Sequence, residues 1–118
     1  MTRGNLDWTV EARGRLRLVA PAGRIDEASA TAFAERLALE IDAAAQDSAA
    51  LLAIDLAGID YMSSRGLRGL TLAQRQSGES GITIVLVRPN AIMREILAIS
   101  RYDKVFRVVD GIEAIDTA

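Results

Sequence analysis

Hydrophobic and polar residues alternate along the first part of the chain. Over residues 6–12 every second side chain is apolar, the pattern of a β-strand with one face in water. The dipeptide Arg13-Gly14 suits a tight turn, and residues 15–20 repeat the strand pattern. The sequence therefore predicts a β-hairpin whose second strand ends at Pro21, since proline has no N–H to offer a neighbouring strand.

A helical repeat follows this hairpin. Apolar residues recur every four positions from Phe33 to Ile41, which predicts an amphipathic helix. Its charged residues, Glu40 among them, lie mostly elsewhere around the turn. Asp26 or Ser29 can cap this helix, because a short side-chain oxygen accepts hydrogen bonds from the free N–H groups of the first turn.

The later part of the chain alternates between strand-like and helix-like segments. The pattern predicts strands over residues 51–56, 82–87 and 105–109, and helices after the serines at 63–64, after the Pro-Asn pair at 89–90, and after Asp110, which can cap the last one. Strands that alternate with helices require mostly right-handed crossovers and give a partly parallel sheet. The sequence therefore predicts one α/β domain over residues 1–118, a mixed sheet with helices packed mainly on one face, in the order β-β-α-β-α-β-α-β-α.

Composition removes several classes of function. The net charge of -2 argues against a general nucleic-acid binder, which needs a basic surface to neutralise phosphates. Cysteine and histidine are both absent, so the usual zinc ligands, the thiol nucleophile and the commonest general base are missing. We therefore expect no metal, no cofactor and no enzymatic activity, and partners that are proteins.

The chain also lacks the features of a membrane or secreted protein. No apolar run approaches the ~20 residues that cross a bilayer, and the first residues are too polar for a signal peptide. We therefore expect a cytoplasmic protein with no direct insertion into a membrane. The oligomeric state is left open, with a homodimer as one possibility.

Two enzyme-like interpretations lack their supporting residues. Asp55 lies near the end of a central strand, as in receiver domains, but no acidic pair follows the first strand and Lys104 does not end a strand. The serines at 63–64 are not in a G-x-S-x-G elbow, and a serine hydrolase would need the absent histidine. Phosphate-binding loops of the G-x-x-x-x-G-K-[ST] and G-x-G-x-x-G kinds are missing as well.

The two adjacent serines stand where a buried strand gives way to a helix. The first N–H groups of a helix have no partners within it, so a hydroxyl here can cap the helix or be displayed to a binding partner. On capping preference alone, the cap is the ordinary interpretation. Asp26 is open to the same two interpretations, and Arg65 and Arg68 are most simply a solvated helix face.

Three segments carry a resemblance to a known family. They are GRIDEASATAFAERL at residues 23–37, LLAIDLAGIDYMSSRGLRGL at 51–70, and VRPNAIMREILAISRYDKVFRVVDGIEA at 87–114. In order and spacing they resemble the STAS domain of bacterial anti-sigma factor antagonists, over nearly the whole chain. The most specific part is the strand that leads through two small polar residues into a helix opened by Gly-Leu.

The resemblance implies a partner switch. Ser64 matches the family's phosphoacceptor, and the unmodified antagonist binds a serine kinase that also serves as the anti-sigma factor. Phosphorylation by that kinase releases the antagonist, and a metal-dependent serine phosphatase resets it. The partner-binding residues implied in this way, together with the loop from 60 to 68, are Asp26, Asp60, Met62, Ser63, Ser64, Arg65, Gly66 and Arg68.

Two positions depart from the family pattern and leave an alternative open. Ser63 stands where many members carry aspartate, which makes it a second candidate acceptor, and Arg65 stands where a small residue is common. A long cation beside the acceptor can stabilise a phosphate or obstruct a kinase cleft. The alternative function is a STAS subunit of a signalling scaffold or transport complex that binds protein constitutively. Nucleotide binding has been suggested for some members, and nothing in this sequence independently supports it.

Overall fold

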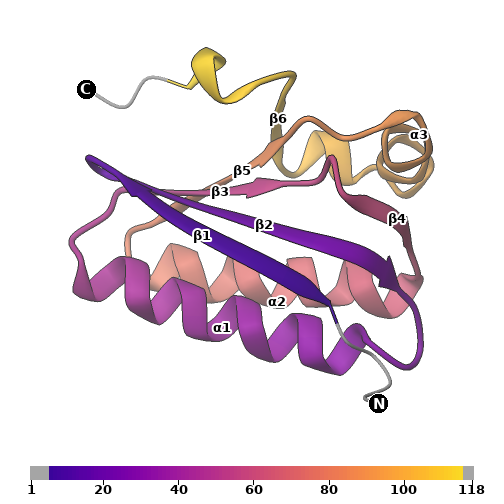
Figure 1. The fold of residues 1–118 in the computed structure, drawn as a ribbon, viewed down its shortest axis with the longest axis horizontal. Coiled ribbons are helices and arrows are strands. Elements are labelled where there is room, and N and C mark those ends of the chain that lie inside the picture. Colours follow the sequence, from indigo (N-terminus) through magenta and orange to yellow (C-terminus); the bar gives the residue numbers. More distant parts are fainter. Residues whose placement is uncertain (1–5, 116–118) are drawn as a thin grey trace.

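A mixed sheet lies at the centre of the fold (Figure 1). The structure is a computed structural model that describes residues 6–115. Within that range the strands are β1 (Asp7–Arg13), β2 (Leu16–Ile25), β3 (Leu51–Asp55), β4 (Ile59–Met62), β5 (Thr83–Val87) and β6 (Arg107–Val109). The helices are α1 (Ala30–Gln46), α2 (Ser64–Glu79) and α3 (Ala91–Ser100), with short 3-10 turns η1 (Tyr102–Lys104) and η2 (Ile112–Ala114).

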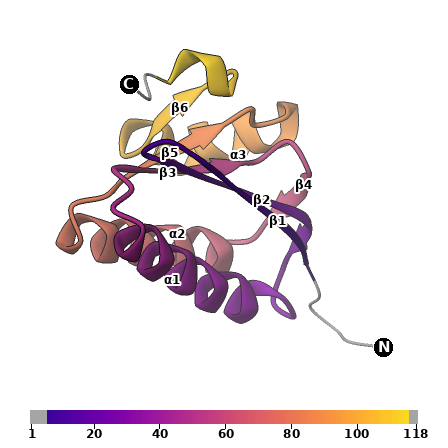
Figure 2. The same cartoon turned by 60° about the vertical axis from the view of Figure 1, so that its left-hand side comes forward.

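The sheet has the strand order β1-β2-β3-β5-β6, and β4 pairs with the end of β2. Among the described strands, β1 and β2 form an antiparallel hairpin and every other pair is parallel. The two long helices α1 and α2 lie side by side on one face of the sheet, and α3 lies beside β4 at one end (Figures 1 and 2). The predicted mixed α/β fold is therefore confirmed.

Strand β2 continues past Pro21, where the sequence pattern predicted its end. Its residues Leu16–Val19 pair with β3, and residues 23–25 pair with β4. Pro21 stands between these two stretches and is opposite Trp8 of β1. Proline is tolerated there because its missing N–H faces a gap in the ladder and no strand partner needs it. On its edge away from β1, strand β2 thus pairs first with β3 and then with β4.

Strand β4 was missed by the sequence pattern, so the predicted element order was wrong at this point. The strand is only four residues long, Ile59–Met62, and carries exposed Asp60 in its middle. Its pairing partner is the segment Gly23–Ile25, far away in the sequence. A strand this short is specified by that distant partner and not by its own periodicity. Because β4 pairs with the end of β2, the chain enters α2 beside the end of β2.

The two candidate caps of α1 stabilise the preceding loop instead. The helix begins at Ala30, and Ser29 is its N-cap residue without a side-chain capping bond. The Ser29 hydroxyl accepts from the Asp26 N–H at 3.0 Å and donates to the Arg24 carbonyl at 2.7 Å. Asp26 in turn accepts from the Ala28 N–H at 3.0 Å, an Asx turn. The sequence prediction of a cap was wrong, but both residues remain structural.

The end of the chain is less helical than predicted. Strand β6 covers Arg107–Val109, and the closing helix is a single 3-10 turn whose N-cap residue is Gly111. Asp110 therefore does not cap it, and its carboxylate pairs with Arg94 of α3 at 2.5 Å. Three residues are too few to complete a stable α-helical turn without a strong cap.

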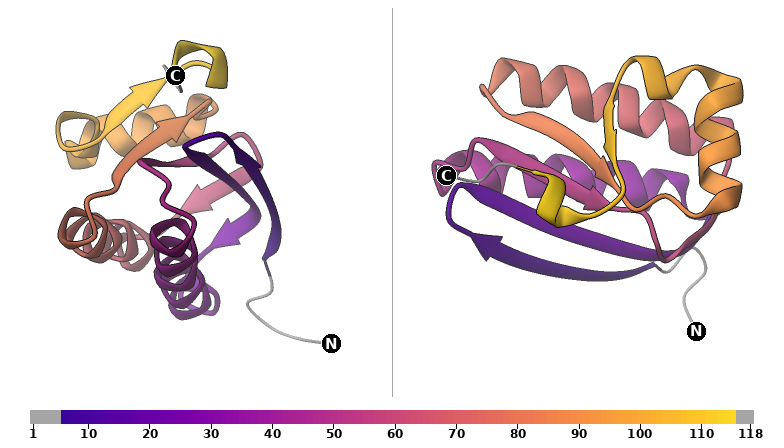
Figure 3. Two further views of the ribbon diagram at one scale, coloured as in Figure 1. Left: turned by 90° about the vertical axis from the view of Figure 1, so that its left-hand side faces the viewer. Right: turned by 90° about the horizontal axis from the view of Figure 1, so that it is seen from above.

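Helices α1 and α2 cover one face of the sheet and the C-terminal segment lies on the other (Figure 3), and apolar side chains pack on both faces. The larger layer lies under α1 and α2, and its fully buried members include Phe33, Leu37, Ile41, Leu52, Ile54 and Leu70. The alternate residues of the strands form a smaller layer on the other face with the C-terminal segment, including Leu16, Ala53, Val85 and Ile115. Since each such large side chain contributes ~1.5–3 kcal/mol on burial, the layer under α1 and α2 dominates stability.

Candidate functional site

The junction between β4 and α2 brings together most of the residues that the sequence singled out. The Ser63 N–H donates to the Ile25 carbonyl at 2.8 Å, which ties the end of β4 to the end of β2. Asp26 follows Ile25 directly, so the acidic loop and the start of α2 are neighbours in space. This closeness depends on the β2–β4 pairing, which joins segments more than thirty residues apart.

The structure gives the two serines different environments. Ser63 is the N-cap of α2, and its hydroxyl oxygen accepts from the Gly66 N–H at 3.3 Å. It is only 9% exposed. Ser64 is the first residue of the helix and is exposed to solvent. The hydroxyl of Ser63 is therefore engaged in the fold, while Ser64 is exposed at the surface.

Gly66 allows the first turn of α2 to press against the sheet. A Cβ atom at this position would lie 2.6 Å from Met62 Cγ and 2.7 Å from Ile25 Cγ2, closer than carbon atoms approach in folded proteins. Met62 itself is 1% exposed. Met62 and Gly66 thus both lie under the surface and shape it from below, and their direct contact with a partner stays a prediction.

Charged side chains surround the exposed start of α2. Arg65 Nε lies 3.1 Å from Glu27 Oε1, and Arg24 Nε lies 3.4 Å from Asp26 Oδ2. The Arg24 guanidinium also stacks over the Tyr61 ring, 4.3 Å from its centroid. These ion pairs are largely solvated, so they contribute little to stability and their members are free to exchange partners.

A shallow groove of about 400 Å³ runs between the first turns of α1 and α2. Small residues let the two helices approach, since a Cβ on Gly69 would lie 3.4 Å from the Ala34 Cβ. Arg65, Arg68 and Leu72 border the groove on α2, and Glu35 borders it on α1. The surface next to Ser64 is thus hollow, with an apolar floor and a charged rim.

The remaining predicted residues lie on the two elements that meet at this junction, and the structure adds others near it. Asp60 and Arg68 are both exposed, on β4 and α2. Glu27, Arg24 and Tyr61 also belong to the surface, and sequence reasoning missed them. No local signal could have found Arg24 and Tyr61, because they become neighbours only through the pairing of β2 with β4.

Asp55, considered above as a receiver-type acceptor, is engaged elsewhere. Its carboxylate binds Arg88 at 2.6 Å and accepts from the Ala57 N–H at 3.0 Å. Over residues 6–115 no group of three acidic side chains comes close enough to hold a metal ion. The described helices include none that is long and apolar enough to span a membrane.

Comparison with known proteins gives the family. The family model described as STAS domain matches residues 7–115. A Bordetella bronchiseptica protein named "Putative anti-sigma factor antagonist BtrV" is 32% identical over 88 residues, which cover 75% of this chain and 76% of that protein.

Solved structures share the fold at lower identity. An anti-sigma factor antagonist from Mycobacterium paratuberculosis has a TM-score of 0.76 at 24% identity, over 94% of this chain and 91% of that one. The phosphorylated form of the Bacillus cell fate determinant SpoIIAA has a TM-score of 0.64 at 16% identity, over 93% and 97%. With the family match extending from β1 to the C-terminal 3-10 turn, the chain belongs to the STAS domain family.

Proposed function

We propose that the chain, residues 1–118 acting as one domain, is an anti-sigma factor antagonist in a partner-switching pathway. The support is the family membership together with a relative at 32% identity that carries this description. In this role the protein is a substrate of enzymes and a ligand of a regulator, not a catalyst. Its partners are a serine kinase that acts as the anti-sigma factor and a metal-dependent serine phosphatase, all of them in the cytoplasm.

The switch residue in this proposal is Ser64. The observation that carries it is the contrast between Ser64, which is exposed, and Ser63, which is buried and accepts a hydrogen bond from the Gly66 N–H. A kinase must seat the acceptor oxygen in its own active site, and only an outward-facing side chain permits that without local unfolding. Ser63 serves the same switch by beginning the helix that displays its neighbour.

Phosphate at Ser64 is compatible with the fold. The group adds about -1.5 to -2 charges and three acceptor oxygens, and the N-terminal end of a helix favours negative charge. Arg65 is the adjacent residue and is tied to Glu27 only by an exposed ion pair. We expect the phosphate to draw Arg65 from Glu27, since a dianion attracts a guanidinium more strongly than one carboxylate does.

The unmodified form would bind its kinase through the surface around Ser64. Asp60 and Arg68 supply exposed charges there, Asp26 supplies a half-buried one, and the groove beside Leu72 supplies an apolar floor. A partner seated over a neutral hydroxyl is repelled once a dianion takes its place. Phosphorylation therefore changes binding without unfolding the protein.

Mass analysis of the protein from its own host tests this proposal. The intact mass is measured before and after treatment with a metal-dependent serine phosphatase, and the modified residue is mapped. We expect one phosphatase-sensitive phosphate on Ser64 and none in Ser64→Ala. Ser63→Ala is the matched control, which should still be modified. Phosphate on Ser63 would move the site, and a chain never modified in resting or stressed cells would end the switch proposal.

One observation favours the alternative of a constitutive assembly subunit. Helix α3 exposes two large apolar side chains seven residues apart, Ile92 at 55% and Ile99 at 77%. Residues at this spacing lie on one face of a helix, and such a face suits a permanent protein contact. If this role is correct, Ile99→Asp abolishes assembly while Ser64→Asp leaves it unchanged. If the protein is a switch, Ser64→Asp weakens binding to the partner and Ile99→Asp leaves it unchanged.

A further inference from the structure

Strand β1 borders the sheet with one edge unpaired within residues 6–115. Its only described neighbour is β2, and all but one of its seven residues are exposed. The strand lies at the outer edge of the molecule in both views of Figure 3. An edge of this length offers a row of free N–H and C=O groups to another strand.

The register of the hairpin shows which backbone groups point outward. Residues opposite one another in an antiparallel pair either exchange two hydrogen bonds or direct their groups away from each other. Trp8 lies opposite Pro21, which has no N–H, so this pair is of the second kind. The alternation then makes Trp8, Val10 and Ala12 the residues whose N–H and C=O face the open edge. This set is symmetric about Val10.

We propose that this edge pairs with the same edge of a second copy of the chain, antiparallel about a two-fold axis at Val10. In that register Val10 meets its own equivalent, and Trp8 of each copy meets Ala12 of the other. Each of these pairs can exchange two backbone hydrogen bonds. The two sheets thereby become one continuous sheet, with both α1 helices on the same face.

The charges of β1 select this register. Asp7 of each copy falls opposite Arg13 of the other, and Glu11 falls opposite Thr9. Arg13 already pairs with Glu11 of its own strand, and its guanidinium has donors left for a second carboxylate. A shift of two residues would set Asp7 opposite Glu11, or Glu11 opposite itself, and like charges directly opposite are destabilising.

Apolar surface adjoins the same edge. Trp8 stacks on Phe33 of α1 and carries Arg36 over its ring, so this side of β1 faces the helix. Val10 lies on the same side as Trp8 by the alternation of the strand and is 39% exposed. Leu39 is one turn beyond Arg36 and is 64% exposed. Pairing would cover Val10 and bring Leu39 toward the partner's α1.

Sedimentation equilibrium of the purified full chain tests the proposal, over about 10 µM to about 1 mM. A single edge with a small apolar border is a modest interface, so we expect a dimer that dissociates within this range. Val10→Pro removes an outward N–H but no bond to β2, and it should weaken dimerisation at least about tenfold. Far-UV circular dichroism shows whether the variant keeps its fold.

Exchanging the charges of Asp7 and Arg13 tests the proposed register of the two β1 strands without introducing a proline. Asp7→Arg places two arginines opposite each other and should weaken the dimer about tenfold, and the double variant Asp7→Arg/Arg13→Asp should restore it. Val105→Ala, at an exposed apolar position away from β1, is the control that leaves the dimer unchanged. A chain that is monomeric throughout, or a dimer indifferent to both changes at β1, overturns the proposal. None of these outcomes depends on whether Ser64 is phosphorylated.

Discussion

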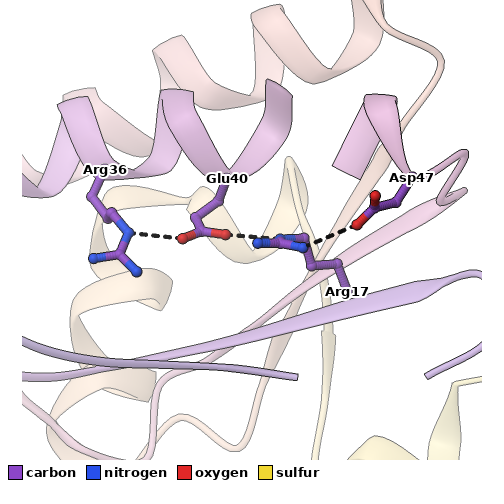
Figure 4. A network of polar contacts seen from close by, with 4 residues as sticks. All are labelled: Arg17, Arg36, Glu40 and Asp47. Carbon is purple, nitrogen blue, oxygen red and sulfur yellow. Dashed lines mark hydrogen bonds and ion pairs between the residues drawn. The ribbon is translucent and has the colours of Figure 1, made fainter. Parts of the chain in front are cut away.

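The two ends of α1 use the same kinds of charged residue in opposite ways. Near its C-terminal end, Glu40 is almost fully buried and accepts from Arg17 at 2.8 Å and from Arg36 at 2.7 Å (Figure 4). Arg17 also reaches Asp47 at 3.4 Å. In the loop just before α1, Glu27 forms a single ion pair with Arg65 of α2, and both side chains are more than 60% exposed.

This difference distinguishes ion pairs that hold the fold together from those at the candidate functional surface. The Glu40 carboxylate joins α1 to β2 through Arg17, and both arginines are needed because a buried charge without partners is costly. The pair of Glu27 and Arg65 lies in high dielectric, where an ion pair contributes ~0–1 kcal/mol. Ion pairs that break at a small cost in free energy suit a surface that binds different partners in turn.

The largest effect is expected at Glu40. Glu40→Ala leaves Arg17 with one exposed carboxylate neighbour and empties a buried site, so the free energy of unfolding should fall by about 2–3 kcal/mol. Urea denaturation measures it. Glu35→Ala, at an exposed position of the same helix, is the control and should change stability by less than about 0.5 kcal/mol. Equal losses in the two variants would contradict a stabilising role for the Glu40 network.

Gly66 should show the next largest effect, at the functional end. Gly66→Ala forces a methyl group against Met62 and Ile25, and overpacking of this kind costs about 1–3 kcal/mol. The matched control is Gly78→Ala, in the same helix with no atom within 4 Å of the new Cβ. That variant should be more stable than wild type by about 0.5–1 kcal/mol, because alanine favours a helix. Thermal unfolding compares the two, and a stabilised Gly66→Ala would disprove the close contact.

The serine pair should give a smaller and asymmetric effect. Ser63→Ala removes the acceptor for the Gly66 N–H and should cost about 1 kcal/mol of stability. Ser64→Ala should change stability by less than about 0.5 kcal/mol but remove the phosphate. Urea denaturation and intact mass together separate the two roles. If Ser64→Ala were the more destabilising of the pair, the assignment of cap and acceptor would have to be exchanged.

Binding to the kinase partner gives a further check on Ser64. Ser64→Asp introduces a charge where the proposal requires a neutral hydroxyl, and affinity for the partner should fall by about 1–3 kcal/mol. Ser64→Ala should keep the affinity of the unmodified protein. Isothermal titration calorimetry measures both, with far-UV circular dichroism as the control for folding. Equal affinities of wild type and Ser64→Asp would count against a switch.

The same contrast explains what the sequence could predict. Periodicity identified the helices and most strands, since the apolar stripe from Phe33 to Ile41 is a local signal. It also led to the serine turn, because a strand followed by small polar residues and a helix is visible in one stretch of chain. The sequence pattern placed Glu40 outside the apolar stripe of the helix, which suggests an exposed residue. In the structure Glu40 is buried, with 4% of its surface exposed. Its partner Arg17 is 23 residues away, on β2.

Pairing across the fold accounts for the other misses too. β4 depends on the end of β2, and the burial of Met62 depends on Gly66 and Ile25. The resemblance assigned the acceptor to Ser64, with Ser63 as a second candidate, and the capping bond of Ser63 that supports this proposal is not visible in the sequence. The local pattern and the family resemblance therefore marked the serine turn as the candidate site, and long-range packing decides which of its side chains are exposed.

The smallest effect is expected for the ion pair of Arg65 and Glu27. A double-mutant cycle with Arg65→Ala and Glu27→Ala should give a coupling free energy below about 0.5 kcal/mol in the unmodified protein, since both side chains are solvated. Once Ser64 carries phosphate, Arg65→Ala should become the costlier of the two changes, because the guanidinium then has a dianion as its partner. Urea denaturation of both forms measures the cycle. A coupling that stays the same after phosphorylation would show that Arg65 does not respond to the phosphate, and would leave it as part of the docking rim alone.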